Sequence, residues 1–158
     1  MRVIGIDPGV TGALALIDTD YPEHTDIWDL EAAISASTKT VSGRALAERL
    51  IDTWSVDCIF VEEVHANTMS YKGNFTLGLA TGIILGVCTA LERPVRRIKP
   101  KEWQQAMGLS NIPPKERKDA HRQRAIEMWP QLGDRLNRIK DHNRADALLI
   151  AEAGRRTL

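Results

Sequence analysis

Residues 3–17 read VIGIDPGVTGALALI, a stretch that decides the fold because it sets a carboxylate and a glycine-rich turn between two apolar runs. The run that ends at Ile6 is rich in β-branched residues, which is typical of a strand covered on both faces. Asp7 follows directly, and Gly9 and Gly12 give the turn after it conformational freedom. The stretch therefore predicts two strands joined by a tight turn, with one carboxylate at the end of the first. On the local sequence alone, an Asx turn without a further role is the alternative for this carboxylate.

Length and composition indicate one globular domain, which we expect to span residues 1–158. Hydrophobic residues make up 43% of the chain and charged residues 27%, as in ordinary globular proteins. We find neither an apolar run as long as a membrane span nor a signal segment, so we expect a cytoplasmic protein without a membrane partner. Cys58 and Cys88 lie in apolar stretches without metal-binding spacing, which predicts buried reduced thiols and no zinc site.

Charge is unevenly divided along the chain, although the net charge is zero. Residues 1–92 hold five Lys and Arg against thirteen Asp and Glu, a net of −8, whereas residues 93–158 hold sixteen against eight, a net of +8. A basic half indicates a polyanionic partner if its cations form one face, and a merely solvated surface is the alternative.

Hydrophobic periodicity predicts the other elements. We expect further strands at residues 27–30, 58–61 and 94–98, and helices at 43–54, 75–91, 100–107, 115–128 and 142–155. Residues 31–42 have no clear pattern. Strands that come first and then mix with helices predict an α/β fold in which an antiparallel meander joins parallel strands, with helices on both faces.

The helix expected at 75–91 is apolar nearly all round and carries Gly78, Gly82 and Gly86 at four-residue spacing. Each interior glycine costs about 1 kcal/mol of helix stability relative to alanine. The spacing therefore indicates that another backbone packs close to this stripe. Two partners fit: the sheet of the same chain, or the same helix in a second copy.

Three acidic positions have a common placement. Asp7 ends one buried strand, Glu62 or Glu63 ends another, and Asp146 lies in the first turns of the last helix. If the two strands are parallel neighbours, their carboxyl ends meet at one sheet edge, where sites form in α/β proteins. Clustered carboxylates need a counter-charge, and hard divalent cations such as Mg²⁺ supply it. A pair of such ions can promote the hydrolysis of a phosphodiester. The alternative is that the three acids are exposed to solvent and form no site.

Three segments together resemble the RuvC family of Holliday-junction resolvases: residues 4–9 (IGIDPG), 59–64 (IFVEEV) and 145–151 (ADALLIA). The resemblance implies an RNase H-like mixed five-stranded sheet with helices on both faces. It also implies a homodimer, two Mg²⁺ or Mn²⁺ ions per active site, no nucleotide cofactor, and paired nicks in a four-way DNA junction. Carried over, Asp7 bridges the metals, Glu62 is the strand-end ligand and Asp146 is the helix ligand.

One position departs from the family pattern. Bacterial members place an acid or a histidine three residues before the last aspartate, where this chain has Asn143. We expect Asp141 to take the fourth catalytic and metal-binding place, because hard cations prefer carboxylates. The alternatives are His142 and Asn143, whose side-chain carbonyl oxygen can ligate but carries no charge. The short basic C-terminal motif resembles phage-type relatives, which is consistent with a phage-encoded protein acting in the host cytoplasm.

DNA contacts are expected from the basic half and from the polar loop at 65–73. Lysine and arginine hold phosphates independently of sequence, which suits recognition of a junction by its shape. The basic candidates are Lys99, Lys101, Lys115, Lys118 and Arg122. The loop candidates, at the region that in the family enters the junction centre, are His65, Tyr71 and Lys72.

The sequence thus predicts a crossover junction endodeoxyribonuclease of DNA recombination and repair. Two other functions stay open: a junction-binding protein that has lost cleavage, which Asn143 makes conceivable, and an RNase H-like nuclease acting on RNA, as in the YqgF relatives. An actin-like ATPase is disfavoured, because that fold needs two such domains.

Overall fold

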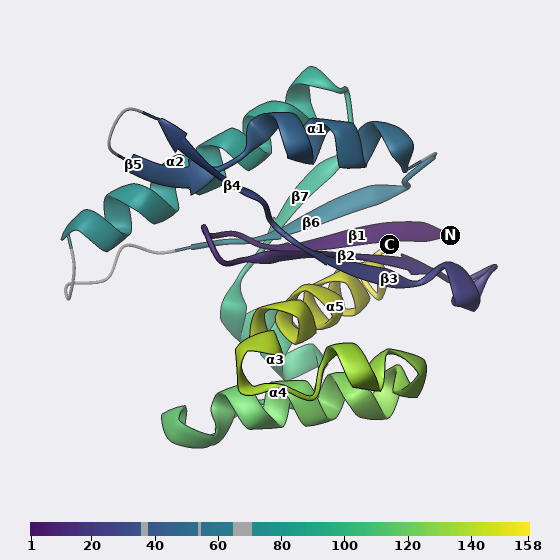
Figure 1. The fold of residues 1–158 in the computed structure, drawn as a ribbon. Helices are drawn as coiled ribbons and strands as arrows, with labels where there is room; N and C mark the ends of the chain where they lie inside the picture. The colour runs from purple at the N-terminus through teal and green to yellow at the C-terminus, as the bar shows by residue number, and fades with distance from the viewer. Residues whose placement is uncertain (36–37, 54, 65–70) are drawn as a thin grey trace.

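A computed structural model describes residues 1–35, 38–53, 55–64 and 71–158. Five strands form its main sheet: β1 (Arg2–Asp7), β2 (Ala13–Asp18), β3 (Asp26–Asp29), β6 (Cys58–Glu62) and β7 (Val95–Ile98). Their spatial order is β3-β2-β1-β6-β7 (Figure 1). Strand β2 pairs antiparallel with both β1 and β3, whereas β6 is parallel to β1 and β7 is parallel to β6. This confirms the mixed five-stranded sheet.

Within the described residues, five α-helices cover both faces of the sheet, which confirms the expected α/β class. They are α1 (Gly43–Asp52), α2 (Tyr71–Ala90), α3 (Pro100–Ala106), α4 (Pro114–Met128) and α5 (His142–Arg155), and three short 3-10 helices are η1 (Pro22–His24), η2 (Pro130–Arg135) and η3 (Ile139–Asp141). In Figure 1, α1 and α2 lie on one face, while α5 lies against the other and α4 packs outside α5.

Two local expectations were incomplete. The segment without a clear pattern contains a second antiparallel pair, β4 (Ala32–Ser35) and β5 (Thr38–Val41). Each strand has only four residues, and the two buried residues of β5, Thr40 and Val41, are adjacent, so no apolar alternation announces the pair. Helix α2 begins at Tyr71, four residues before the expected start at residue 75.

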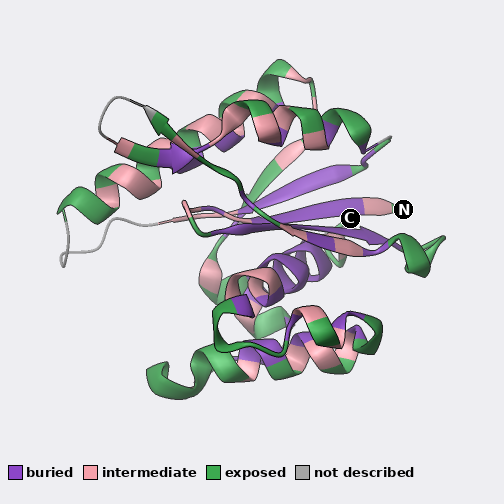
Figure 2. Cartoon of the chain, viewed as in Figure 1, coloured by how far each residue is buried: buried purple, intermediate pink, exposed green. Residues whose placement is uncertain are grey.

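The central strands β1, β2 and β6 are buried on both sides (Figure 2). Their alternating side chains divide the core into two clusters. Ile4 and Ile6 face α1 and α2, whereas Val3 lies in the cluster formed with α5. Gly5 shares the α5 side, and a Cβ there would stand 2.1 Å from the carbonyl oxygen of Ala147. Helix α5 therefore lies directly on the backbone of β1, and α4 covers its outer side.

Helix α2 buries one face and exposes the other. Ala80, Ile84 and Cys88 are fully buried, while an added Cβ at any of the three stripe glycines would meet no described atom within 4 Å. The stripe therefore does not pack on the sheet of its own chain. By length and composition α2 is also apolar enough to cross a membrane, so the expectation that no run reaches that length was wrong. Both cysteines are free and buried, as expected.

Candidate active site

Strand alternation places two carboxylates on the α5 side of the sheet. Asp7 has the same parity as Val3 and Gly5, and Glu62 the same parity as Phe60, which packs in the α5 core. The parallel register pairs Ile6 with Val61, so Asp7 and Glu62 are the next residues of neighbouring strands. Glu63 follows the end of β6 with the opposite parity, which gives a structural reason to prefer Glu62.

Helix α5 brings the third carboxylate, Asp146, to the same place. Burial raises the pKa of Asp7 well above its ordinary value of 3.8, and the charges of Asp146 and then Glu62 raise it further. Burial is also the main cause that raises the pKa of Glu62, with Asp146 adding to it. The three half-buried groups therefore lie within range of one another's charge. The structure thus brings together three of the four predicted catalytic residues.

Two buried side chains that the sequence analysis missed hold these carboxylates. The Trp103 indole Nε1–H of α3 donates to Glu62 Oε1 at 2.8 Å, and His121 Nδ1 of α4 lies 2.7 Å from Asp146 Oδ1. Their rings also meet edge to face, with centroids 5.0 Å apart. Each is a lone aromatic or imidazole residue in a strongly polar segment. This contrast is the sequence feature that could have pointed to them.

Asp141 is not part of this group. Its carboxylate is 2% exposed and accepts hydrogen bonds from the backbone and guanidinium of Arg138, with Arg144 also within 3.6 Å. Burial would raise the pKa of Asp141, but the Arg138 hydrogen bonds and the arginine charges outweigh it and hold this pKa below its usual range. Asp141 therefore links η3 to α5 through its contacts with these two arginines. At the departing position, the Asn143 side-chain amide donates to the carbonyl of Thr11 in the β1–β2 turn.

The basic residues divide into two groups. The four lysines Lys99, Lys101, Lys115 and Lys118 are exposed, and the charge of Lys118 acts on Asp7. Arg122 is buried instead, because its guanidinium donates to the carbonyl of Asn137 and to Asp119. It therefore does not present the free phosphate-binding group that we expected.

Two of the three loop candidates, Tyr71 and Lys72, lie in the first turn of α2. Tyr71 is 92% exposed, whereas His65 lies outside the described residues. Lys72 lines an open groove of about 410 Å³ between the β1–β2 turn and α2. The groove residues are Gly9, Val10, Lys72, Gly73, Thr76 and Leu77.

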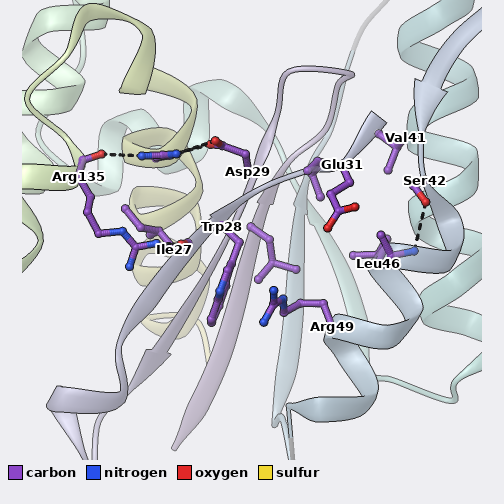
Figure 3. Close-up of a pocket in the computed structure, with 13 residues that line it drawn as sticks. Ile27, Trp28, Asp29, Glu31, Val41, Ser42, Leu46, Arg49 and Arg135 are labelled. Atoms are coloured by element: carbon purple, nitrogen blue, oxygen red, sulfur yellow. Dashed lines mark hydrogen bonds and ion pairs between the residues drawn. The ribbon is translucent and has the colours of Figure 1, made fainter. Parts of the chain in front are cut away.

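A second cavity, of about 260 Å³, lies at the β3 edge of the sheet (Figure 3). The Arg49 guanidinium lies over the Trp28 ring at 4.7 Å, and Arg144 is paired with Asp29. The three clustered carboxylates do not line it. This cavity is therefore separate from the candidate active site.

The whole architecture matches that of solved RuvC structures. Thermus thermophilus RuvC in complex with Holliday junction substrate aligns with 99% of this chain and 96% of its own, with a TM-score of 0.65 and 22% sequence identity. The fold is that of RuvC. A second Thermus thermophilus RuvC structure aligns with a TM-score of 0.56 and 21% identity, over 97% of this chain and 92% of its own. No protein-family model and no curated protein matches the chain.

The donor set on this RuvC fold suits a hard cation. Within the described ranges, no group of three His, Cys, Asp or Glu side chains is arranged to hold a metal ion as it stands. The three carboxylates nevertheless repel one another at one sheet edge, and carboxylate oxygens are the ligands that Mg²⁺ and Mn²⁺ prefer. A bound divalent cation would remove this repulsion, so the residues fit such an ion.

Proposed function

We propose that this protein is a divalent-metal-dependent endonuclease that resolves branched DNA, above all four-way junctions, by paired nicks. The observation that carries the proposal is the meeting of Asp7, Glu62 and Asp146 on a RuvC fold. A Thermus thermophilus protein with this fold is described in complex with a Holliday junction substrate, which supports the choice of DNA.

Asp7, Glu62 and Asp146 are the residues that would hold the metal, which we propose to be two Mg²⁺ or Mn²⁺ ions. Such ions supply activated water and stabilise the leaving oxygen of a phosphodiester. The protein contributes rigid placement, because two of the carboxylates end neighbouring strands and the third lies on a helix seated on β1. Lys118 adds a positive charge beside Asp7, where a scissile phosphate would need it. His142 and Asn143 remain the candidates for a fourth ligand.

The DNA would follow the exposed lysines and the groove beside the β1–β2 turn. Lys72 and the open groove lie next to the turn that carries Asp7, so a backbone seated there would reach the carboxylates. Lys99, Lys101 and Lys115 would hold flanking phosphates without reading sequence, since they are exposed and cationic.

We propose a homodimer whose seam is the exposed stripe of α2. The stripe glycines leave the backbone bare, and the exposed aromatic side chains of Tyr71 and Phe75 extend the same face. A second copy of α2 could approach this backbone closely, which explains glycines that cost helix stability without serving the fold of one chain. Two active sites in one dimer would also account for paired nicks.

Cleavage of a synthetic four-way junction in Mg²⁺, compared with a linear duplex of the same arms, tests the activity. The wild-type protein is expected to nick the junction in symmetric pairs. Glu62→Gln should lower the rate by at least about 100-fold, because it removes charge stabilisation at the reacting phosphate. Glu63→Gln is the matched control, one residue further along with the opposite parity, and should keep the wild-type rate.

Two results would contradict the proposal. Tight junction binding without nicks from the wild-type protein would favour a junction-binding protein, with Asn143 as the suspected cause. Preferential cleavage of RNA strands in matched substrates would favour an RNA nuclease instead.

A further inference from the structure

We propose that Trp103 and His121 form a paired support that positions Glu62 and Asp146 for metal binding. This inference rests on the proposed function, because it concerns how the same carboxylates are held. Neither residue touches substrate in the proposed arrangement, so both are positioning residues.

Trp103 fixes Glu62 by a hydrogen bond to one of its two carboxylate oxygens. Its indole ring is 1% exposed and its Nε1–H points at Oε1 of Glu62, at 2.8 Å. A tryptophan N–H is a donor without acceptor capacity, so this contact can orient the carboxylate but cannot replace it as a ligand. The other oxygen, Oε2, accepts no side-chain hydrogen bond from Trp103, so a cation could bind there.

His121 fixes Asp146 in the same manner from α4. The imidazole is 3% exposed, and its Nδ1 lies 2.7 Å from Oδ1 of Asp146. Nε2 is buried and has no hydrogen-bond partner in the described part of the chain. A proton that serves the Asp146 contact must therefore sit on Nδ1, because Nε2 has no acceptor beside it. The geometry points to an Nδ1–H that donates to Asp146.

The two supports also hold each other. The rings of Trp103 and His121 meet edge to face, with centroids 5.0 Å apart and planes at 70°. Aromatic pairs in this arrangement gain stability beyond their buried area. A shift of α3 or α4 would therefore move both carboxylates together, and the pair sets the spacing between the strand-end ligand and the helix ligand.

Mn²⁺ binding to the metal-free protein, followed by the electron paramagnetic resonance signal of free Mn²⁺, tests the inference without DNA or catalysis. Trp103→Phe keeps a buried ring and removes the N–H, and His121→Phe removes the Nδ1 donor. Each should weaken Mn²⁺ binding by about 10- to 100-fold, as loss of an outer-sphere partner does. His121→Asn places an amide donor near the Nδ1 position and should restore most of the affinity.

The matched control is Trp129→Phe, which alters a tryptophan of the same core that contacts neither carboxylate. It should bind Mn²⁺ like the wild type. Melting curves in EDTA check that every variant folds. Long-range ¹H–¹⁵N spectra of the metal-free protein should show a proton on His121 Nδ1, and an Nδ1 without a proton would overturn the assignment.

The outcomes separate this inference from the proposed function. A wild-type protein that binds no Mn²⁺ would overturn both. Wild-type binding with unchanged affinity in Trp103→Phe and His121→Phe would overturn the positioning role alone. A His121→Asn protein as weak as His121→Phe would show that the hydrogen bond is not what matters at this residue.

Discussion

At the scale of the residue, Asp7 ends β1 half-buried, with Asp146 and Glu62 close enough to repel its charge. Its pKa is raised in the folded protein, so above the ordinary value of 3.8 the folded state keeps a proton that the unfolded state has lost. The free energy of unfolding of the metal-free protein therefore falls as pH rises from about 4 through the raised pKa. Glu62 acts in the same direction, because its pKa is raised as well.

Asp7→Asn should separate stability from activity. Without metal, the variant should melt at a higher temperature than the wild type at pH 8, because a buried repelled charge is gone, and the difference should shrink towards pH 4. Junction cleavage should fall by at least about 100-fold. Melting curves in EDTA at several pH values measure the first effect. Asp52→Asn, on an exposed residue of α1, is the control, and a less stable Asp7→Asn protein at pH 8 would contradict the argument.

At the scale of the element, the contact between α5 and β1 decides where Asp146 lies. Gly5 lets the helix backbone approach the strand, and the small residues Ala147 and Ala151 line the contact on the helix side. At the far end of α5, Gly154 meets the ring of Phe60 in the same close manner. Helix α4 then covers α5, so the position of the third carboxylate depends on packing on both sides.

Gly5→Ala should destabilise the protein by about 1–3 kcal/mol or more, because the new methyl group would overlap backbone atoms of α5 that cannot move independently. Urea unfolding measures the change. Gly133→Ala, in η2, places its methyl where no described atom lies within 4 Å and should change the free energy of unfolding by less than about 0.5 kcal/mol. Equal stability of the two variants would mean that α5 does not rest on β1 as described.

At the scale of the whole molecule, the glycine stripe of α2 and the four lysines are exposed on the outside of the described chain. The stripe serves no contact within one described copy, whereas the opposite face of α2 is buried against the sheet side that holds α1. A dimer through α2 would set the distance between two active sites, and this distance would select junctions whose strands match it.

Gly82→Leu should disrupt this dimer while leaving the monomer folded. Leucine has a higher helix propensity than glycine, and the structure has open space at this position, so the monomer should not lose stability. Sedimentation velocity measures the mass, and we expect a dimer for the wild type and a monomer for the variant. Gln123→Leu, which adds the same side chain to the exposed face of α4, should remain dimeric. Equal masses for Gly82→Leu and the wild type would contradict the proposed seam.

The sequence by itself determined the strands of the main sheet, the α-helices and the positions of three carboxylates along them. These features are local, because apolar runs, turn residues and strand parity can each be recognised within a few neighbouring residues. The β1–β6 pairing followed from the same logic, because parallel strands bring their carboxyl ends to one edge.

Tertiary structure alone decided which polar side chains face the site. Trp103 and His121 reach Glu62 and Asp146 across 41 and 25 residues of sequence, respectively, so no local pattern could report these contacts. The sequence suggests that Arg122 is a surface cation, yet its guanidinium is buried and donates to the backbone carbonyl of Asn137, just before η3. The direction of the α2 glycine stripe was open for the same reason. A side chain's partner depends on which elements pack around it, and that is settled by the whole fold.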